Sequence, residues 1–139
     1  MNMNKALNQY AAVKRQTGVE DKNPHELILM LYDATIEHLS KAKGCIIRKE
    51  FAAKGEAIGR VLTIIGGLQT FLDMEQGGEV SKNLDALYDY CTRRLYDATS
   101  TNDVEILDEI IGLIREIREG WAGIHQEAVS IFAESGQAN

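Results

Sequence analysis

Proline and aromatic residues are scarce in this chain, and their scarcity argues against a β-sheet protein. A single proline, Pro24, and 6% aromatic residues occur in 139 positions. Sandwiches and barrels need many turns and draw on aromatic and β-branched residues for their strands. The composition therefore favours helices, and the length is ordinary for one domain.

Cysteine, long apolar runs and positive charge are also in short supply. Cys45 and Cys91 have no CxxC spacing and no neighbouring histidine, so neither a disulfide framework nor a zinc site is expected. No run approaches 18 apolar residues and no hydrophobic signal core follows Met1, so we expect no membrane insertion and a cytoplasmic location. With 15 Lys and Arg against 21 Asp and Glu, the chain lacks the basic footprint that nucleic-acid binding requires.

Motifs for catalysis and for metal binding are missing as well. Helical bundles that hold two irons place a Glu three residues before a His on two helices. Lys22, Thr35 and Ala122 take that position before the three histidines of this chain. No Gly-rich phosphate loop, HExxH or GxSxG motif occurs either. The sequence therefore predicts no enzyme activity, no metal and no cofactor.

Apolar residues at alternating spacings of three and four predict four amphipathic helices. The first begins after an Asn23 N-cap and runs to about residue 49, and the second covers 51–72. The third runs from a Ser81 cap to about residue 100, and the fourth from an Asn102 cap to Ile131. Short connections favour an all-α, antiparallel, up-down-up-down four-helix bundle over residues 24–133. Residues 1–23 are expected to form a flexible, loosely docked N-terminal arm with room for a short helix, and 134–139 a frayed tail.

Parts of the predicted helices carry more apolar residues than one buried stripe needs. Residues 27–32 form six consecutive apolar positions, which surround a helix on all sides. Two interpretations remain open. The N-terminal arm covers the surplus through Leu7 and Tyr10, or the surplus is a groove for another protein. Both hold if the arm covers the groove until a partner displaces it.

Several segments resemble one family, the flagellar secretion chaperone FliS. They are 23–34 (NPHELILMLYDA), 54–58 (KGEAI), 72–79 (LDMEQGGE), 83–95 (NLDALYDYCTRRL) and 117–121 (IREGW), together with Tyr10. The resemblance implies a cytoplasmic export chaperone with a helical-bundle fold. Such a chaperone binds the disordered C-terminal segment of flagellin, prevents its premature polymerisation, and aids its delivery to the type III export gate of the flagellum.

The excess apolar residues and the resemblance together give a predicted partner-binding surface. Leu7 and Tyr10 are expected to form a displaceable cover. The groove itself is expected to consist of Leu27, Leu31, Ile64, Leu68, Phe71, Leu72, Leu87, Tyr90 and Leu95. The alternative is a helical structural or adaptor module that pairs with itself through the same faces, as a homodimer or larger homo-oligomer.

Overall fold

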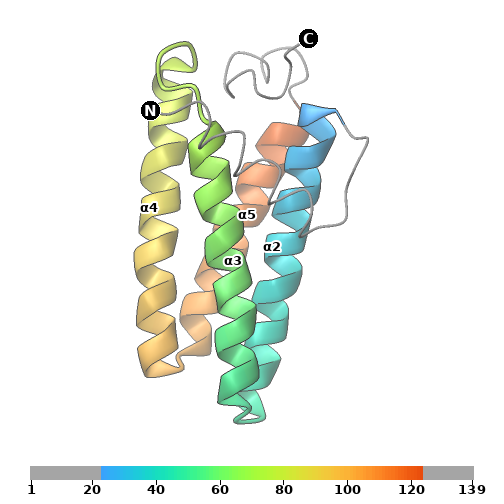
Figure 1. The fold of residues 1–139 in the computed structure, drawn as a ribbon, viewed down its shortest axis with the longest axis vertical. Coiled ribbons are helices and arrows are strands. Elements are labelled where there is room, and N and C mark those ends of the chain that lie inside the picture. Colours follow the sequence, from blue (N-terminus) through green and yellow to red (C-terminus); the bar gives the residue numbers. More distant parts are fainter. Residues whose placement is uncertain (1–22, 124–139) are drawn as a thin grey trace.

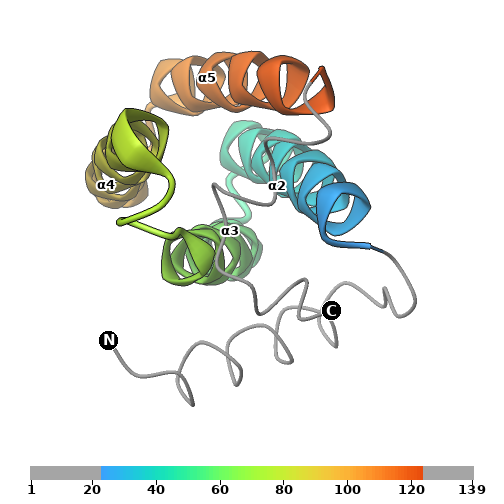
Figure 2. The ribbon, with the colours of Figure 1, turned by 90° about the horizontal axis from the view of Figure 1, so that it is seen from above.

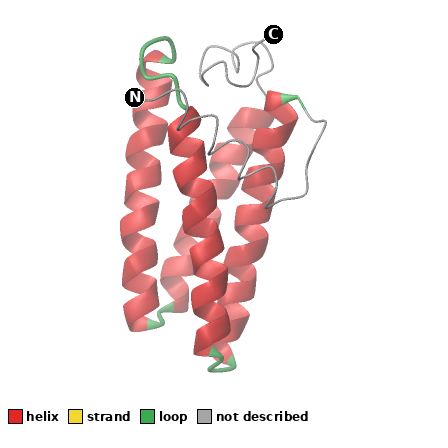
Figure 3. Ribbon diagram, viewed as in Figure 1, coloured by secondary structure: helices red, strands yellow, loops and turns green. Residues whose placement is uncertain are grey.

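The computed structural model describes residues 23–123, and they form four helices. These are α2 (Pro24–Ile47), α3 (Phe51–Phe71), α4 (Gly78–Thr101) and α5 (Val104–Ala122). Each helix runs antiparallel to the one before it, and α5 returns to pack against α2 (Figure 1). Helices and connecting turns account for this whole part of the chain (Figure 3). The prediction of an all-α four-helix bundle is confirmed.

The helix starts show which sequence signals the fold uses. The Asn23 side chain accepts a hydrogen bond from the Glu26 N–H at 2.8 Å, so the predicted cap of the first helix is confirmed. Ser81, in contrast, is not a cap but a buried residue inside α4, which begins three residues earlier. Asp73 closes the turn that precedes α4, since its side chain accepts from the N–H groups of Glu75 and Gln76.

The predicted cap at Asn102 is also wrong, by one residue. Asn102 ends α4 in the left-handed conformation, with φ of 57°, which asparagine tolerates better than most residues. Asp103 caps α5 instead, because its carboxylate accepts from the Glu105 N–H at 2.9 Å. The extension of the fourth helix to Ile131, the N-terminal arm and the tail lie outside the described residues.

The core consists of the apolar stripes of all four helices, and it contains both thiols. Cys45 and Cys91 are buried and free. Burial raises the pKa of the Cys91 thiol to about 11, which keeps it protonated and unreactive at neutral pH.

One charged side chain is also buried, at the corner where α4 ends. Lys54 is 6% exposed, and its Nζ donates to the Thr99 carbonyl at 2.9 Å and to Asn102 Oδ1 at 2.7 Å. These oxygens lie at the C-terminal end of α4, where a cation is favoured by the helix dipole. Lys54 therefore fixes the α4–α5 corner from α3.

No described helix has the length and apolar content that crossing a bilayer requires.

Candidate functional site

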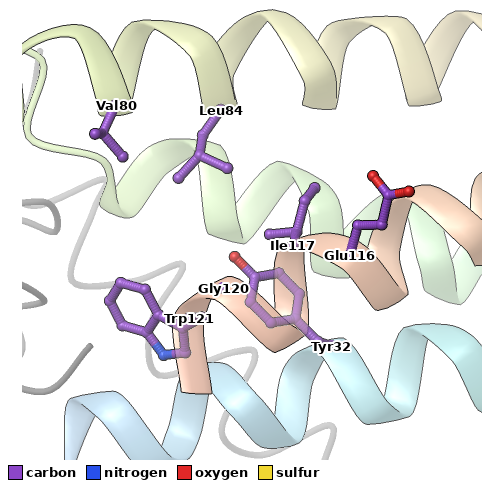
Figure 4. A pocket seen from close by; sticks show the side chains of 7 residues that line it. All are labelled: Tyr32, Val80, Leu84, Glu116, Ile117, Gly120 and Trp121. Atoms are coloured by element: carbon purple, nitrogen blue, oxygen red, sulfur yellow. The ribbon is translucent and has the colours of Figure 1, made fainter. Parts of the chain in front are cut away.

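An apolar groove opens between α4 and α5, at the end of the bundle away from their connecting turn. Its volume is about 290 Å³. Figure 4 shows the seven lining residues, which are Tyr32, Val80, Leu84, Glu116, Ile117, Gly120 and Trp121. Most of these side chains are hydrocarbon, so the groove suits apolar side chains of a partner.

The tilt of α5 explains why the groove lies where it does. Seen from above, α3 and α4 are viewed nearly end-on, whereas α5 shows its flank (Figure 2). The two helices start together at the Asn102–Asp103 turn, and α5 then crosses from α4 towards α2 (Figure 1). Their facing side chains therefore separate towards the far end. There Val80 is 49% exposed, and Leu84 and Ile117 are only half-buried.

A pair of tyrosines lies at the floor of the groove. Tyr32 lines it from α2, and its hydroxyl lies 2.7 Å from that of Tyr88 on α4. Both side chains are fully buried. Burial raises the pKa of Tyr32 and of Tyr88 well above the ordinary value, so both remain neutral hydroxyls. They supply hydrogen bonding at the floor without adding charge.

One end of the groove is held by Trp121 and His25. Trp121 Nε1 donates to the His25 carbonyl at 3.1 Å, and His25 Nε2 lies 2.8 Å from the Trp121 carbonyl. The two rings are stacked, with their centroids 5.2 Å apart. The end of α5 is thereby fixed to the start of α2, so this wall of the groove is preformed.

Farther along the same seam, a polar cluster joins α4 to α5. The Tyr90 hydroxyl donates to Glu109 Oε2, and Arg94 Nε donates to Glu109 Oε1 at 3.2 Å. The hydrogen bond from Tyr90, with help from Arg94, lowers the pKa of the Glu109 carboxyl and keeps it ionised. The same bond raises the pKa of Tyr90. The cluster closes the seam where the groove ends.

The structure separates the predicted groove residues into three groups. Seven are buried in the core and no more than 7% exposed, namely Leu27, Leu31, Ile64, Leu68, Phe71, Leu72 and Leu95. The structure thus places these seven side chains in the core, and their contact with a partner stays a prediction. Leu87 and Tyr90 on α4 are half-buried and stay predicted contact residues. Leu7 and Tyr10 lie outside the described residues.

The burial of Leu27 and Leu31 follows from the two neighbours of α2. α2 packs against both α3 and α5, so it buries a wider arc than one stripe. Leu27 and Leu31 lie on the buried arc of α2, whereas Met30, in the same run of six apolar residues, is 38% exposed. Six consecutive apolar residues thus fit a helix with two flanking partners.

The residues that form the walls of the groove are not among the contact residues predicted from the sequence. Val80, Leu84, Ile117 and Trp121 belong to the apolar stripes of α4 and α5 and look like ordinary core positions. The partial exposure of Val80, Leu84 and Ile117 depends on the splay of two helices, which no local pattern encodes. The described residues contain no group of three or more His, Cys, Asp or Glu side chains that could hold a metal.

Comparison with known proteins places the chain in a family. Residues 6–128 match the family model of the flagellar protein FliS. The chain is 44% identical over 120 residues to the flagellar secretion chaperone FliSB of Pseudomonas aeruginosa, covering 86% of this chain and 95% of that one. It is 39% identical over 123 residues to FliS of Salmonella typhimurium, covering 88% and 91%. A crystal structure of a bacterial flagellar chaperone has the same fold, with a TM-score of 0.69 at 18% identity, covering 83% and 94%.

Proposed function

Because the chain belongs to the FliS family of flagellar secretion chaperones, we propose that it binds the disordered C-terminal segment of flagellin. In this proposal it acts in the cytoplasm, prevents premature polymerisation of flagellin, and aids delivery to the type III export gate. The observation that carries the proposal is the apolar groove between α4 and α5.

The groove suits an amphipathic helix of flagellin. Val80 and Leu84 on one wall face Ile117 and Trp121 on the other, and both walls belong to rigid helices. Helices bind such grooves through apolar residues spaced three and four apart. A segment that is unfolded until it binds loses conformational entropy, so it needs a partner surface that is already ordered. The contact between Trp121 and His25 provides this order.

Binding of this kind needs no catalysis. The chaperone and flagellin associate by mass action, and neither a nucleotide nor a metal takes part. Leu87 and Tyr90 lie on α4 and extend the proposed contact surface beyond the groove. The apolar groove is complementary to a segment whose own apolar face would otherwise pair with other flagellin molecules.

Titration calorimetry with a peptide of the flagellin C-terminal segment tests the proposal. Val80→Asp places a carboxylate on the groove wall at a side chain that is 49% exposed, so the fold should tolerate it. We expect affinity to fall by more than about tenfold. Tyr96→Asp is the matched control, because Tyr96 is 61% exposed on the same helix and does not line the groove. Equal affinity of the wild type and Val80→Asp would remove the groove from the proposal.

The alternative function, a self-associating helical module, predicts a different result. Light scattering would then show an oligomer whose size depends on protein concentration and not on the flagellin peptide. A chaperone instead forms a complex of defined stoichiometry when the peptide is added.

A further inference from the structure

The turn between α2 and α3 exposes two large apolar side chains. Ile47, the last residue of α2, is 69% exposed, and Phe51, the first residue of α3, is 46% exposed. The turn lies at the end of the bundle opposite the groove (Figure 1). At 1.5 Å per residue, α2 separates the two ends by roughly 35 Å. A helix bound in the groove therefore leaves this turn free.

The turn is rigid, although three residues form it. The N–H groups of Arg48, Lys49 and Glu50 donate to carbonyls in the last turns of α2, at 3.0, 3.0 and 2.8 Å. Lys49 adopts φ of 62°, a left-handed conformation in which glycine would be less strained. The chain thus holds a lysine at a position where backbone energetics favour another residue, and strain of this kind is often linked to function.

Positive charge gathers around the two exposed apolar residues. Residues 43–54 contain four cations and one carboxylate, in a chain whose net charge is −6. Lys43 pairs with Asp108 and Lys54 is buried, so Arg48 and Lys49 are the two of these cations that are exposed at the turn. Arg48 is largely exposed and pairs only with the neighbouring Glu50, at 3.1 Å. Within residues 23–123, Lys49 makes no ion pair. The turn therefore combines two exposed apolar side chains with Lys49, a cation that has no ion pair among the described residues.

We propose that Ile47, Arg48, Lys49 and Phe51, here called the turn surface, form a second docking site for an acidic, apolar segment of another protein. The proposed partner is a protein other than the flagellin helix in the groove, because that helix would lie at the other end of the bundle, and this choice rests on the proposed function. A membrane is a poorer match, since juxtamembrane lipid binding uses clusters of four to eight cations and the turn surface exposes two. The chaperone could then hold its cargo at one end and dock through the other.

The chemistry of the partner is tested with two short helical peptides that share their leucine positions and carry either glutamate or lysine between them. Amide spectra of the full chain should change at residues 47–51 with the acidic peptide and remain unchanged there with the basic one. The double variant Ile47→Ser/Phe51→Ser should bind the acidic peptide with about tenfold lower affinity. Three results would overturn the proposal. They are equal binding of both peptides, spectral changes with the acidic peptide that are confined to the groove, and binding of the protein to vesicles of phosphatidylglycerol and phosphatidylcholine.

Lys49 offers a sharper test, because its two effects have opposite signs. Lys49→Gly removes the left-handed strain and should raise the melting temperature. The same change removes a cation from the turn surface and should lower the affinity for the acidic peptide by about threefold or more. A variant that is more stable and binds the acidic peptide equally well would contradict the role assigned to Lys49.

Secretion of flagellin by cells that carry Ile47→Ser/Phe51→Ser shows whether the turn surface serves export. This measurement rests on the proposed function. The purified variant should bind the flagellin peptide as the wild type does, while the cells secrete several times less flagellin. Met74→Ser is the control, since Met74 is 44% exposed in the α3–α4 connection at the opposite end. Normal secretion would refute a role in export. If the variant instead bound the flagellin peptide more weakly, the turn would belong to the flagellin-binding surface. An unchanged flagellin affinity of Val80→Asp would count against the groove alone and not against the turn surface.

Discussion

His25 and Trp121 bind each other's backbone through their rings. The indole N–H donates to the His25 carbonyl, and the imidazole Nε2 contacts the Trp121 carbonyl at 2.8 Å. A carbonyl only accepts, so Nε2 carries a hydrogen and this pairing selects the tautomer of the ring. Ninety-six positions separate the two residues, so this contact joins the first turn of α2 to the last turn of α5.

Removal of the indole N–H should loosen that end of the bundle. Trp121→Phe keeps an aromatic ring but leaves the half-buried His25 carbonyl without this donor. We expect the free energy of unfolding to fall by about 1–2 kcal/mol in urea denaturation. Flagellin affinity should fall too, because Trp121 is a wall of the groove. Tyr96→Phe, at an exposed position, is the control and should leave both unchanged.

Lys54 should be the most costly lysine to replace. Lys54→Met removes two hydrogen bonds from a charged donor and leaves the Thr99 carbonyl and Asn102 Oδ1 without it. The expected loss is about 2–3 kcal/mol. Lys43→Met is the comparison, since Lys43 forms a partly exposed ion pair with Asp108 and should lose less than about 1 kcal/mol. Equal losses would mean that the corner of α4 does not depend on Lys54.

Two glycines should respond to alanine in opposite directions. A Cβ at Gly77 would lie 2.6 Å from the Asp73 carbonyl oxygen and even closer to Ser81, so the backbone has to shift. Gly77→Ala should therefore destabilise the protein by about 1–3 kcal/mol. A Cβ at Gly55 meets nothing within 4 Å in α3, so Gly55→Ala should stabilise by about 0.5–1 kcal/mol. Thermal denaturation of the two variants distinguishes these effects.

Stability should fall in alkaline solution. The folded state holds the protons of Cys91, Tyr32 and Tyr88 to higher pH than the unfolded state, because burial raises each pKa. The unfolded chain therefore loses protons first, from about pH 9 upward, and the free energy of unfolding decreases as the pH rises. Each group contributes at most about 1.4 kcal/mol per pH unit. Denaturation of Tyr32→Phe/Tyr88→Phe should show a shallower decline above about pH 10.

Tyr90 should contribute to flagellin binding through its ring. Tyr90→Ala is expected to lower the affinity for the flagellin peptide by more than about fivefold, as the truncation of aromatic interface residues does. Tyr90→Phe keeps the ring and removes only the hydrogen bond to Glu109, so its affinity should stay close to that of the wild type. Calorimetry that shows no loss with Tyr90→Ala would place the contact surface elsewhere on α4.

The sequence predicts the helices better than it predicts the groove. Asn23 and Pro24 mark the start of α2 because capping depends on a few neighbouring atoms. The choice between Asn102 and Asp103 as a cap escaped prediction, since either residue type can end or begin a helix. The exposure of Val80 depends on the angle between α4 and α5, which arises from packing of the whole bundle. The burial of Leu27 and Leu31 likewise depends on how closely α3 and α5 pack against α2, which the local sequence does not encode.

The tyrosine pair gives the groove a chemical preference that its apolar walls lack. Two hydroxyls carry two hydrogens, and the contact between Tyr32 and Tyr88 uses one of them. Among the described residues, no acceptor lies within bonding distance of the second hydrogen. Both side chains are fully buried, so a bound segment reaches this hydrogen only where the groove opens over Tyr32. We expect a carbonyl or carboxylate oxygen placed there to gain a hydrogen bond worth about 1 kcal/mol. We therefore expect the floor to prefer an oxygen atom to a methyl group, and so to favour one register of a bound helix over its neighbours.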